Sequence, residues 1–106
     1  MSKTKQSKTE QTIAKEALNI AYEREISALI ASVRDRASSI TELNDLWYLH
    51  DLLSTKRYEI DGKYEYNSST ILFDFAQLVQ EGWLHLDELK ELKPEMQSKI
   101  SALARM

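Results

Sequence analysis

Residues 8–37, KTEQTIAKEALNIAYEREISALIASVRDRA, decide the fold class of this chain. Neither glycine nor proline interrupts the stretch, and its apolar side chains recur at steps of three and four. Successive helix positions are turned by about 100°, so this spacing gathers apolar side chains on one side of a helix. The stretch therefore predicts a single long helix. Its main apolar stripe consists of Leu18, Tyr22, Ile26, Leu29, Ile30, Val33 and Ala37.

A second apolar side, rich in alanine, lies roughly opposite the first. It consists of Ile13, Ala14, Ala17, Ile20, Ala21, Ala28 and Ala31. Two apolar sides predict two packing partners. At 1.5 Å per residue the helix would be roughly 45 Å long, whereas a compact chain of this size is only about 34 Å across. We therefore expect a second copy to support it. The alternative is a break near Ser27 or Ser32, which would allow a compact monomeric bundle.

Capping and turn residues predict where the long helix begins and where a second helix starts. Ser7-Lys8-Thr9-Glu10 matches a capping box at the beginning of the long helix, and Ser39-Ile40-Thr41-Glu42 matches a second one. A helix over about 42–60 should come next, with a core stripe of leucines and an end at Asp61-Gly62. Two long helices joined by a short link should pair as an antiparallel hairpin. The predicted core stripe of the second helix is Leu46, Leu49, Leu53 and Ile60.

The last third of the chain predicts three shorter helices. Asn67-Ser68-Ser69-Thr70 is a turn and cap cluster, and Gly82 suits a helix end. Proline fits the first position of a helix, so Pro94 marks another start. The fold class is all-α: a flexible tail over 1–8, a long hairpin over 9–64 and a helical head over 65–106. The predicted head helices cover about 69–81, about 87–92, and Pro94 nearly to Met106.

Composition excludes several classes of protein. The chain has 106 residues with 42% hydrophobic and 29% charged side chains, as expected of one globular domain. Its net charge of −3 argues against general nucleic-acid binding, which needs a basic excess. It has no cysteine, no apolar run of membrane-spanning length and no apolar segment typical of a secretory signal. We expect a cytoplasmic protein that does not insert into membranes.

One flank of the second helix combines a large aromatic side chain with charges of both signs. Its members are spaced by three or four residues, which places them side by side on a helix. Tryptophan and arginine are enriched among the residues that dominate protein interfaces. The alternative is a tryptophan that seals the hairpin core beside ordinary solvated charges. The flank consists of Trp47, His50, Asp51, Ser54 and Arg57.

The same flank offers little for catalysis. His50 and Asp51 are adjacent and point about 100° apart, so we expect no hydrogen bond between them as a base and its orienting group. Ser54 could contact His50, but no oxyanion hole is apparent. His50 and His85 lack a metal-binding spacing, and no phosphate-binding glycine loop occurs. We expect neither enzyme activity nor a metal or cofactor.

Two further places predict surface contacts. Phe73 should lie near Gln77 and Gln80, away from the core stripe of its helix, and a phenylalanine on a polar face is a contact candidate. The last helix carries Lys99, Leu103 and Arg105. These three could meet an acidic partner surface, or could simply be a solvated basic helix end.

Residues 45–64, DLWYLHDLLSTKRYEIDGKY, resemble the signature of the cyanobacterial fluorescence recovery protein family. The resemblance continues through FDFAQLVQEG at 73–82 and QSKISALAR at 97–105. It covers nearly everything after the N-terminal tail. A run of this length with rare residues in register is highly specific.

The resemblance implies an elongated, all-helical homodimer formed through the long helices. It implies binding to the photoactivated, red form of the orange carotenoid protein, mainly at its C-terminal domain. Such proteins detach that partner from the phycobilisome and speed its return to the inactive orange form. This ends the dissipation of excess light and restores antenna fluorescence. The place of action would be the cytoplasmic face of the thylakoid, reached indirectly through the phycobilisome.

The resemblance also assigns roles to individual positions. A helical dimer that scaffolds or inhibits an unrelated bacterial protein would share every feature except the signature itself, so it stays as the alternative. The implied partner-binding residues are Trp47, His50, Asp51, Arg57, Phe73, Lys99, Leu103 and Arg105. The implied dimer interface consists of Ile26, Ile30, Val33, Trp47, Asp51 and Arg57.

Overall fold

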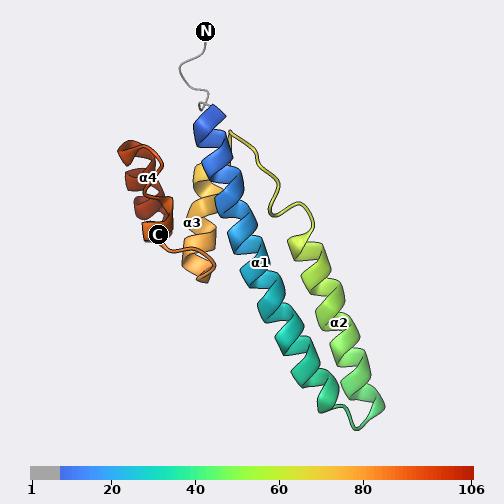
Figure 1. Cartoon of the computed structure of the whole chain (residues 1–106). Coiled ribbons are helices and arrows are strands. Elements are labelled where there is room, and N and C mark those ends of the chain that lie inside the picture. The colour runs from blue at the N-terminus through green and yellow to red at the C-terminus, as the bar shows by residue number, and fades with distance from the viewer. Residues whose placement is uncertain (1–7) are drawn as a thin grey trace.

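The computed structural model describes residues 8–106, and within them all regular structure is helical, as predicted. The molecule is elongated, with extents of 60 × 24 × 22 Å (Figure 1). A long hairpin of two helices carries a smaller group of helices beside its open end. The elements are α1 (Lys8–Ser38), α2 (Leu43–Ile60), α3 (Ile71–Glu81), the 3-10 helix η1 (Leu86–Leu89) and α4 (Pro94–Ala104).

The long helix forms without interruption. α1 runs from Lys8 to Ser38, which matches the predicted span and rules out a break at Ser27 or Ser32. The predicted capping box at its start involves Ser7, which lies outside the described residues. The unbroken helix explains why the molecule is so extended, because 31 residues at 1.5 Å each already exceed 45 Å.

The cap of α2 differs from the prediction. The capping box lies three residues farther along than predicted, with Glu42 as the N-cap residue and Asp45 as the third helical residue. Asp45 Oδ2 accepts from the backbone N of Thr41 at 3.1 Å and of Glu42 at 3.2 Å. These hydrogen bonds hold the pKa of Asp45 below its ordinary value. The Ser39 hydroxyl instead donates to the Asp35 carbonyl at 3.2 Å. Because α1 extends to Ser38, the Ser39 hydroxyl is close enough to satisfy a carbonyl in the last turn of α1.

Both glycines end helices as predicted. Gly62 has φ of +78° and Gly82 has φ of +87°, a backbone region that a side chain disfavours. Before Gly62, the backbone N of Asp61 donates to the Arg57 carbonyl at 2.9 Å. The chain can therefore reverse sharply after α2 and after α3.

The short predicted helix at 87–92 is instead a 3-10 helix that ends at Leu89. The reason lies in α4, where the Gln97 amide donates to the carbonyls of Lys90 at 3.1 Å and Leu92 at 2.6 Å. These carbonyls are therefore satisfied without a continuing helix. The buried Leu89 and Leu92 anchor the segment.

The hydrophobic core lies where α3, η1 and α4 meet the first half of α1. Alanines on α1 permit close approach of the neighbouring helices, so the Ala-rich side finds its partner here. The predicted division into a tail, a hairpin and a head stays a prediction; the structure adds that the first half of α1 packs into the head core. The buried apolar residues are Ala14, Ala17, Leu18, Ala21, Ile71, Phe75, Ala76, Leu78, Leu84, Leu89, Leu92, Met96 and Ile100.

The outer part of the hairpin has no such core. α2 contains no buried residue, and no apolar residue of α1 beyond Ala21 is buried. In the predicted core stripe of α2, Leu49 and Ile60 are half-buried, while Leu46 and Leu53 remain 46% and 39% exposed. The stripe is therefore not a core within the single chain, because two helices alone cannot enclose it.

Candidate functional site

The aromatic flank of α2 is open to solvent. Trp47 is 53% exposed, so it does not seal the hairpin core. Its ring meets the His50 ring edge to face, with centroids 6.2 Å apart. Contrary to prediction, His50 Nδ1 lies 3.3 Å from Asp51 Oδ1. Both side chains are exposed and free to rotate toward each other along the helix surface. The arrangement presents an aromatic surface beside a charge, which suits binding.

Arg57 lies farther along α2, near its C-terminal end. Its side chain is exposed, and within residues 8–106 it forms no ion pair. A cation is favourable there because the last carbonyls of a helix carry partial negative charge. The guanidinium is consequently available for an acidic group on another chain.

A second exposed set lies on the head. Phe73 is 62% exposed, in agreement with its predicted place off the core. Gln80, two turns later on the same side of α3, donates from its amide to the Ala104 carbonyl at 2.9 Å. This bond brings that side of α3 to the end of α4. Leu103 there is half-buried, while Lys99 and Arg105 are exposed. An apolar and basic face results.

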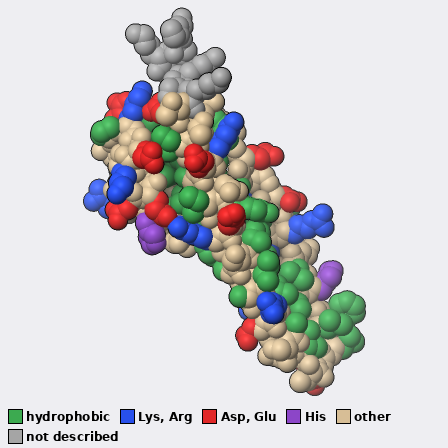
Figure 2. Space-filling view, viewed as in Figure 1, with side chains coloured by type: hydrophobic (Ala, Val, Ile, Leu, Met, Phe, Trp, Pro, Cys, Tyr) green, Lys and Arg blue, Asp and Glu red, His purple; other side chains and the backbone are tan. Residues whose placement is uncertain are grey.

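The two sets lie on different elements. In Figure 1, α2 and α4 lie on opposite sides of α1. Within the described residues, no hydrogen bond, ion pair or ring contact joins the α2 flank to Phe73 or to α4. On the face shown in Figure 2, charged side chains crowd the head, while hydrophobic ones gather along the hairpin toward its tip.

The predicted dimer positions on α1 lie along the outer hairpin. Ile26 and Val33 are half-buried, and Ile30 is 53% exposed. These side chains follow one stripe of the helix, and none of them is enclosed by the chain itself. Their role in a dimer stays a prediction at this point.

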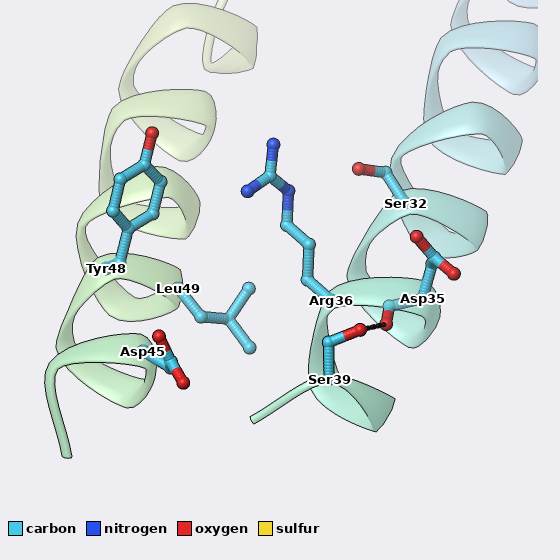
Figure 3. Close-up of a pocket in the computed structure, with 7 residues that line it drawn as sticks. All are labelled: Ser32, Asp35, Arg36, Ser39, Asp45, Tyr48 and Leu49. Atoms are coloured by element: carbon cyan, nitrogen blue, oxygen red, sulfur yellow. Dashed lines mark hydrogen bonds between the residues drawn. The ribbon is translucent and has the colours of Figure 1, made fainter. Parts of the chain in front are cut away.

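A hollow of about 430 Å³ opens between the helices at the tip of the hairpin (Figure 3). Arg36 reaches across it from α1 toward the Tyr48 ring on α2, with 5.7 Å between the guanidinium carbon and the ring centroid. Across residues 8–106, no group of three or more His, Cys, Asp or Glu could hold a metal ion. The hollow is lined by Ser32, Asp35, Arg36, Ser39, Asp45, Tyr48 and Leu49.

A polar cluster joins α1 to the segment after α2 and to α3. The buried Glu25 carboxylate accepts from Lys63 Nζ at 2.8 Å and from the Tyr64 hydroxyl at 2.5 Å. Lys63 also donates to Glu81 at 2.7 Å. Partial burial alone would lower the pKa of Lys63, but its bonds to Glu25 and Glu81 outweigh that effect and raise it. Burial and the neighbouring Glu25 raise the pKa of the Tyr64 phenol.

Arg24, which precedes Glu25 on α1, makes a second polar contact with the head. Arg24 donates from Nη1 and Nη2 to the two carboxylate oxygens of Glu88, at 2.7 and 2.6 Å, and also to the Trp83 carbonyl at 3.1 Å. The Arg24 hydrogen bond, together with one from the backbone N of His85 at 2.9 Å, lowers the pKa of Glu88 to about 2.

These contacts were missed by the sequence reasoning. Lys63 and Tyr64 close the signature run at 45–64, which is the one signal that pointed to them. Arg24 and Glu25 lie among other charged residues of the long helix, and such a pattern is typical of an ordinary solvent-exposed surface. Their partners are far along the chain, so spacing could not reveal them.

Comparison with known proteins identifies the family. Residues 6–104 match the family described as photoprotection regulator fluorescence recovery protein. The chain belongs to this family. The "Fluorescence recovery protein" of Synechocystis sp. PCC 6803 is 55% identical over 86 residues, which cover 81% of this chain and 79% of that protein.

Solved structures of the family share the fold. The fluorescence recovery protein of Fremyella diplosiphon matches with a TM-score of 0.91 and 56% identity, over 96% of this chain and 100% of that one. The Synechocystis protein matches with a TM-score of 0.92 and 49% identity, over the same shares. The predicted family and all-helical fold are therefore confirmed.

Family membership establishes the general role. The chain is a photoprotection regulator, and a regulator of this kind implies protein partners. The family is a regulatory one, in keeping with the expectation that the chain is not an enzyme. None of the helices in residues 8–106 is both long and apolar enough to cross a membrane. The assignment of individual residues to partner binding stays a prediction.

Proposed function

We propose that this chain binds the photoactivated, red form of the orange carotenoid protein, detaches it from the phycobilisome and speeds its return to the orange form. One observation supports this most directly. At two positions to which the family resemblance assigns contact, Trp47 and Phe73, large aromatic side chains are more than half exposed. Exposed aromatics of this kind lose water favourably when a partner covers them.

The proposed action needs no bond to be made or broken. The chain must bind the barrier state of the partner's conformational return more tightly than the red state. Each tenfold gain in rate corresponds to about 1.4 kcal/mol of that difference. A few contacts suffice. Trp47 and Phe73 supply apolar area, while Arg57, Lys99 and Arg105 supply charge for an acidic partner surface, its C-terminal domain in particular.

The separation of the two exposed sets suits a partner with two domains. A surface on the hairpin and another on the head could engage different parts of one partner. Holding those parts near each other lowers the entropic cost of rejoining them. The extended shape of the molecule supports such a bridging role.

We further propose that the working form is a homodimer joined along the hairpin. α2 contains no buried residue, although four apolar residues follow one stripe along it. Ile30, Leu46 and Leu53 remain substantially exposed in the single chain. A second copy packed along this stripe would cover them and add the missing layers of a four-helix arrangement. Continuous exposed apolar stripes are otherwise rare on stable monomers.

The proposed role sets the place of action. The orange carotenoid protein works on the phycobilisome, so the chain would act in the cytoplasm, at the thylakoid surface. It would reach that surface through its partner and not through a membrane segment of its own.

Dark recovery of the photoconverted orange carotenoid protein tests the proposal. Absorbance should show a markedly faster red-to-orange return when the chain is added, and a slower return when its Phe73→Glu variant replaces it. An unchanged rate with a folded, helical chain would contradict the proposal. A helical dimer that scaffolds or inhibits another bacterial protein would then be the better interpretation.

A further inference from the structure

Apolar packing holds only the first half of α1 to the head. The last buried apolar residue of α1 is Ala21, and farther along the helix the one buried side chain is Glu25. A helix and a head that touch over a short apolar patch can tilt relative to each other unless directional contacts fix the angle. Polar contacts with defined geometry provide such fixation.

Two such contacts begin at the end of the apolar patch. Arg24 pairs with Glu88 through both nitrogens and both oxygens, and also binds the Trp83 carbonyl. This fork fixes η1 and the turn after α3 with respect to α1. A bidentate arginine pair restricts orientation as well as distance, because both groups are planar.

The second contact holds the connection between hairpin and head. Glu25 binds Lys63 and Tyr64, which lie in the segment between α2 and α3, and Lys63 also binds Glu81 at the end of α3. Gln77 supports Glu81 from one turn away, at 2.8 Å. One buried carboxylate thus ties together α1, the end of the hairpin and α3.

We propose that Arg24 and Glu25 are positioning residues that set the angle between head and hairpin, and with it the affinity for the protein partner. We call the set Arg24, Glu25, Lys63, Tyr64, Glu81 and Glu88 the polar clamp. Within residues 8–106, no hydrogen bond, ion pair or ring contact joins the clamp to the exposed contact residues. It determines how the head face with Phe73 stands relative to the α2 flank with Trp47. The link to affinity rests on the proposed function, whereas the link to geometry does not.

A distance measurement tests the geometric part without any partner. The chain has no cysteine, so spin labels can be placed at will through Asn44→Cys on α2 and Ser98→Cys on α4, both exposed positions. Diluting labelled chains with unlabelled ones isolates distances within one protomer. The wild-type background should give one narrow distance distribution. Arg24→Glu or Glu25→Gln should broaden or shift it, and Arg24→Glu with Glu88→Arg should narrow it again.

The same variants test the link to affinity. Binding to the red carotenoid protein should weaken between about twofold and thirtyfold in the single variants, the range expected for residues that act through others. The double variant Arg24→Glu with Glu88→Arg should recover much of the lost affinity. Such recovery is not expected if the single variants act only by destabilising the fold. Glu23→Arg is the matched control: it lies on the same turn but forms no ion pair with the head among the described residues, so it should alter neither readout.

The outcomes separate the two proposals. A distance distribution unchanged by Arg24→Glu and by Glu25→Gln would overturn the clamp, whatever the partner does. A changed distribution with unchanged affinity would overturn its positioning role. If the wild-type chain does not bind the carotenoid protein, the proposed function fails, and the distance measurement alone decides whether the clamp holds the head.

Discussion

Lys63 and Glu25 lie 38 positions apart in the sequence, yet Nζ of one is 2.8 Å from Oε1 of the other, in a largely enclosed setting. Glu25 does not stand out in the sequence, and Lys63 does so only as part of the signature run at 45–64. Their contact joins the end of the hairpin to the middle of the longest helix. The connection between the two parts of the molecule thus depends on a charge pair and not on apolar packing alone.

Replacing Lys63 with methionine should destabilise the fold. The change leaves the buried Glu25 and the nearby Glu81 without their shared cation, and losing one partner of an enclosed ion pair costs about 3 kcal/mol. Urea unfolding, at equal protomer concentration, measures the effect. The control is Lys56→Met, because Lys56 pairs with Glu59 in a more exposed setting at 3.5 Å and should contribute about 1 kcal/mol or less. Equal effects of the two substitutions would contradict the prediction.

The Arg24–Glu88 pair should make stability depend on pH in the acid range. The pKa of Glu88 is lowered in the fold to about 2, from an ordinary value of 4.5. The stabilisation that the ionised Glu88 carboxylate gives to the fold is therefore complete above about pH 4.5 and is lost as the pH falls through about 2. Glu88→Gln should lower the free energy of unfolding at pH 7 by about 1 kcal/mol or less, since the pair is partly exposed.

The difference in free energy of unfolding between wild type and Glu88→Gln should then shrink as the pH falls to about 2, where about half of the wild-type carboxyl is protonated. Chemical denaturation at pH 7, 4 and 2 measures this difference. Glu91→Gln, at an exposed position nearby, should show no such trend. If the free energy of unfolding of Glu88→Gln stays below that of wild type by the same amount at all three pH values, the charge of Glu88 is not the cause of the difference.

Ile30→Glu should dissociate the proposed homodimer. A carboxylate placed in an apolar interface must lose its water or keep the interface open, which costs several kcal/mol. We expect dimerisation to weaken at least about a hundredfold. Sedimentation velocity over a concentration series measures it, while circular dichroism should show retained helix. Ala31→Glu, the next residue and turned by about 100°, serves as the control; equal weakening by both changes would place the interface elsewhere.

Phe73→Glu should weaken partner binding while leaving the fold intact. Loss of an aromatic side chain that the partner covers in the complex costs about 2 kcal/mol or more of binding free energy, which corresponds to about thirtyfold in affinity. Titration against the red carotenoid protein measures this. Leu86→Glu, at another exposed apolar position of the head, should have little effect. A marked loss of helix content in the Phe73 variant would instead mean that this residue supports the core.

Local features of the fold were predictable because they depend on neighbouring residues. The uninterrupted pattern from 8 to 37 produced α1, and Gly62 and Gly82 ended helices as their backbone freedom indicated. The same reasoning placed Phe73 off the core, because 100° per residue fixes which side of a helix a residue occupies. This reasoning failed where two local choices competed: the capping box of α2 consists of Glu42 and Asp45, and not of Ser39 and Glu42.

The candidate site was predictable only in part. Periodicity and the signature indicated Trp47 and its neighbours, and the structure shows that their side chains reach solvent. Adjacent helix positions were expected to exclude contact between His50 and Asp51, yet exposed side chains can rotate to within 3.3 Å. Side-chain rotation is a freedom that helical spacing does not describe.

The sequence by itself determined that the chain is helical, where most helices end, and to which family it belongs, because each depends on local pattern or on a long specific run. Only the tertiary structure decided that the apolar core along α1 ends at Ala21. It also decided that the polar contacts of Arg24 and Glu25 hold α1 to the head and to the segment after α2 beyond that point. The physical reason is that burial and ion pairing depend on which distant segments meet. Arg24 and Glu88, 64 positions apart, gain their relation only when the head folds back onto α1.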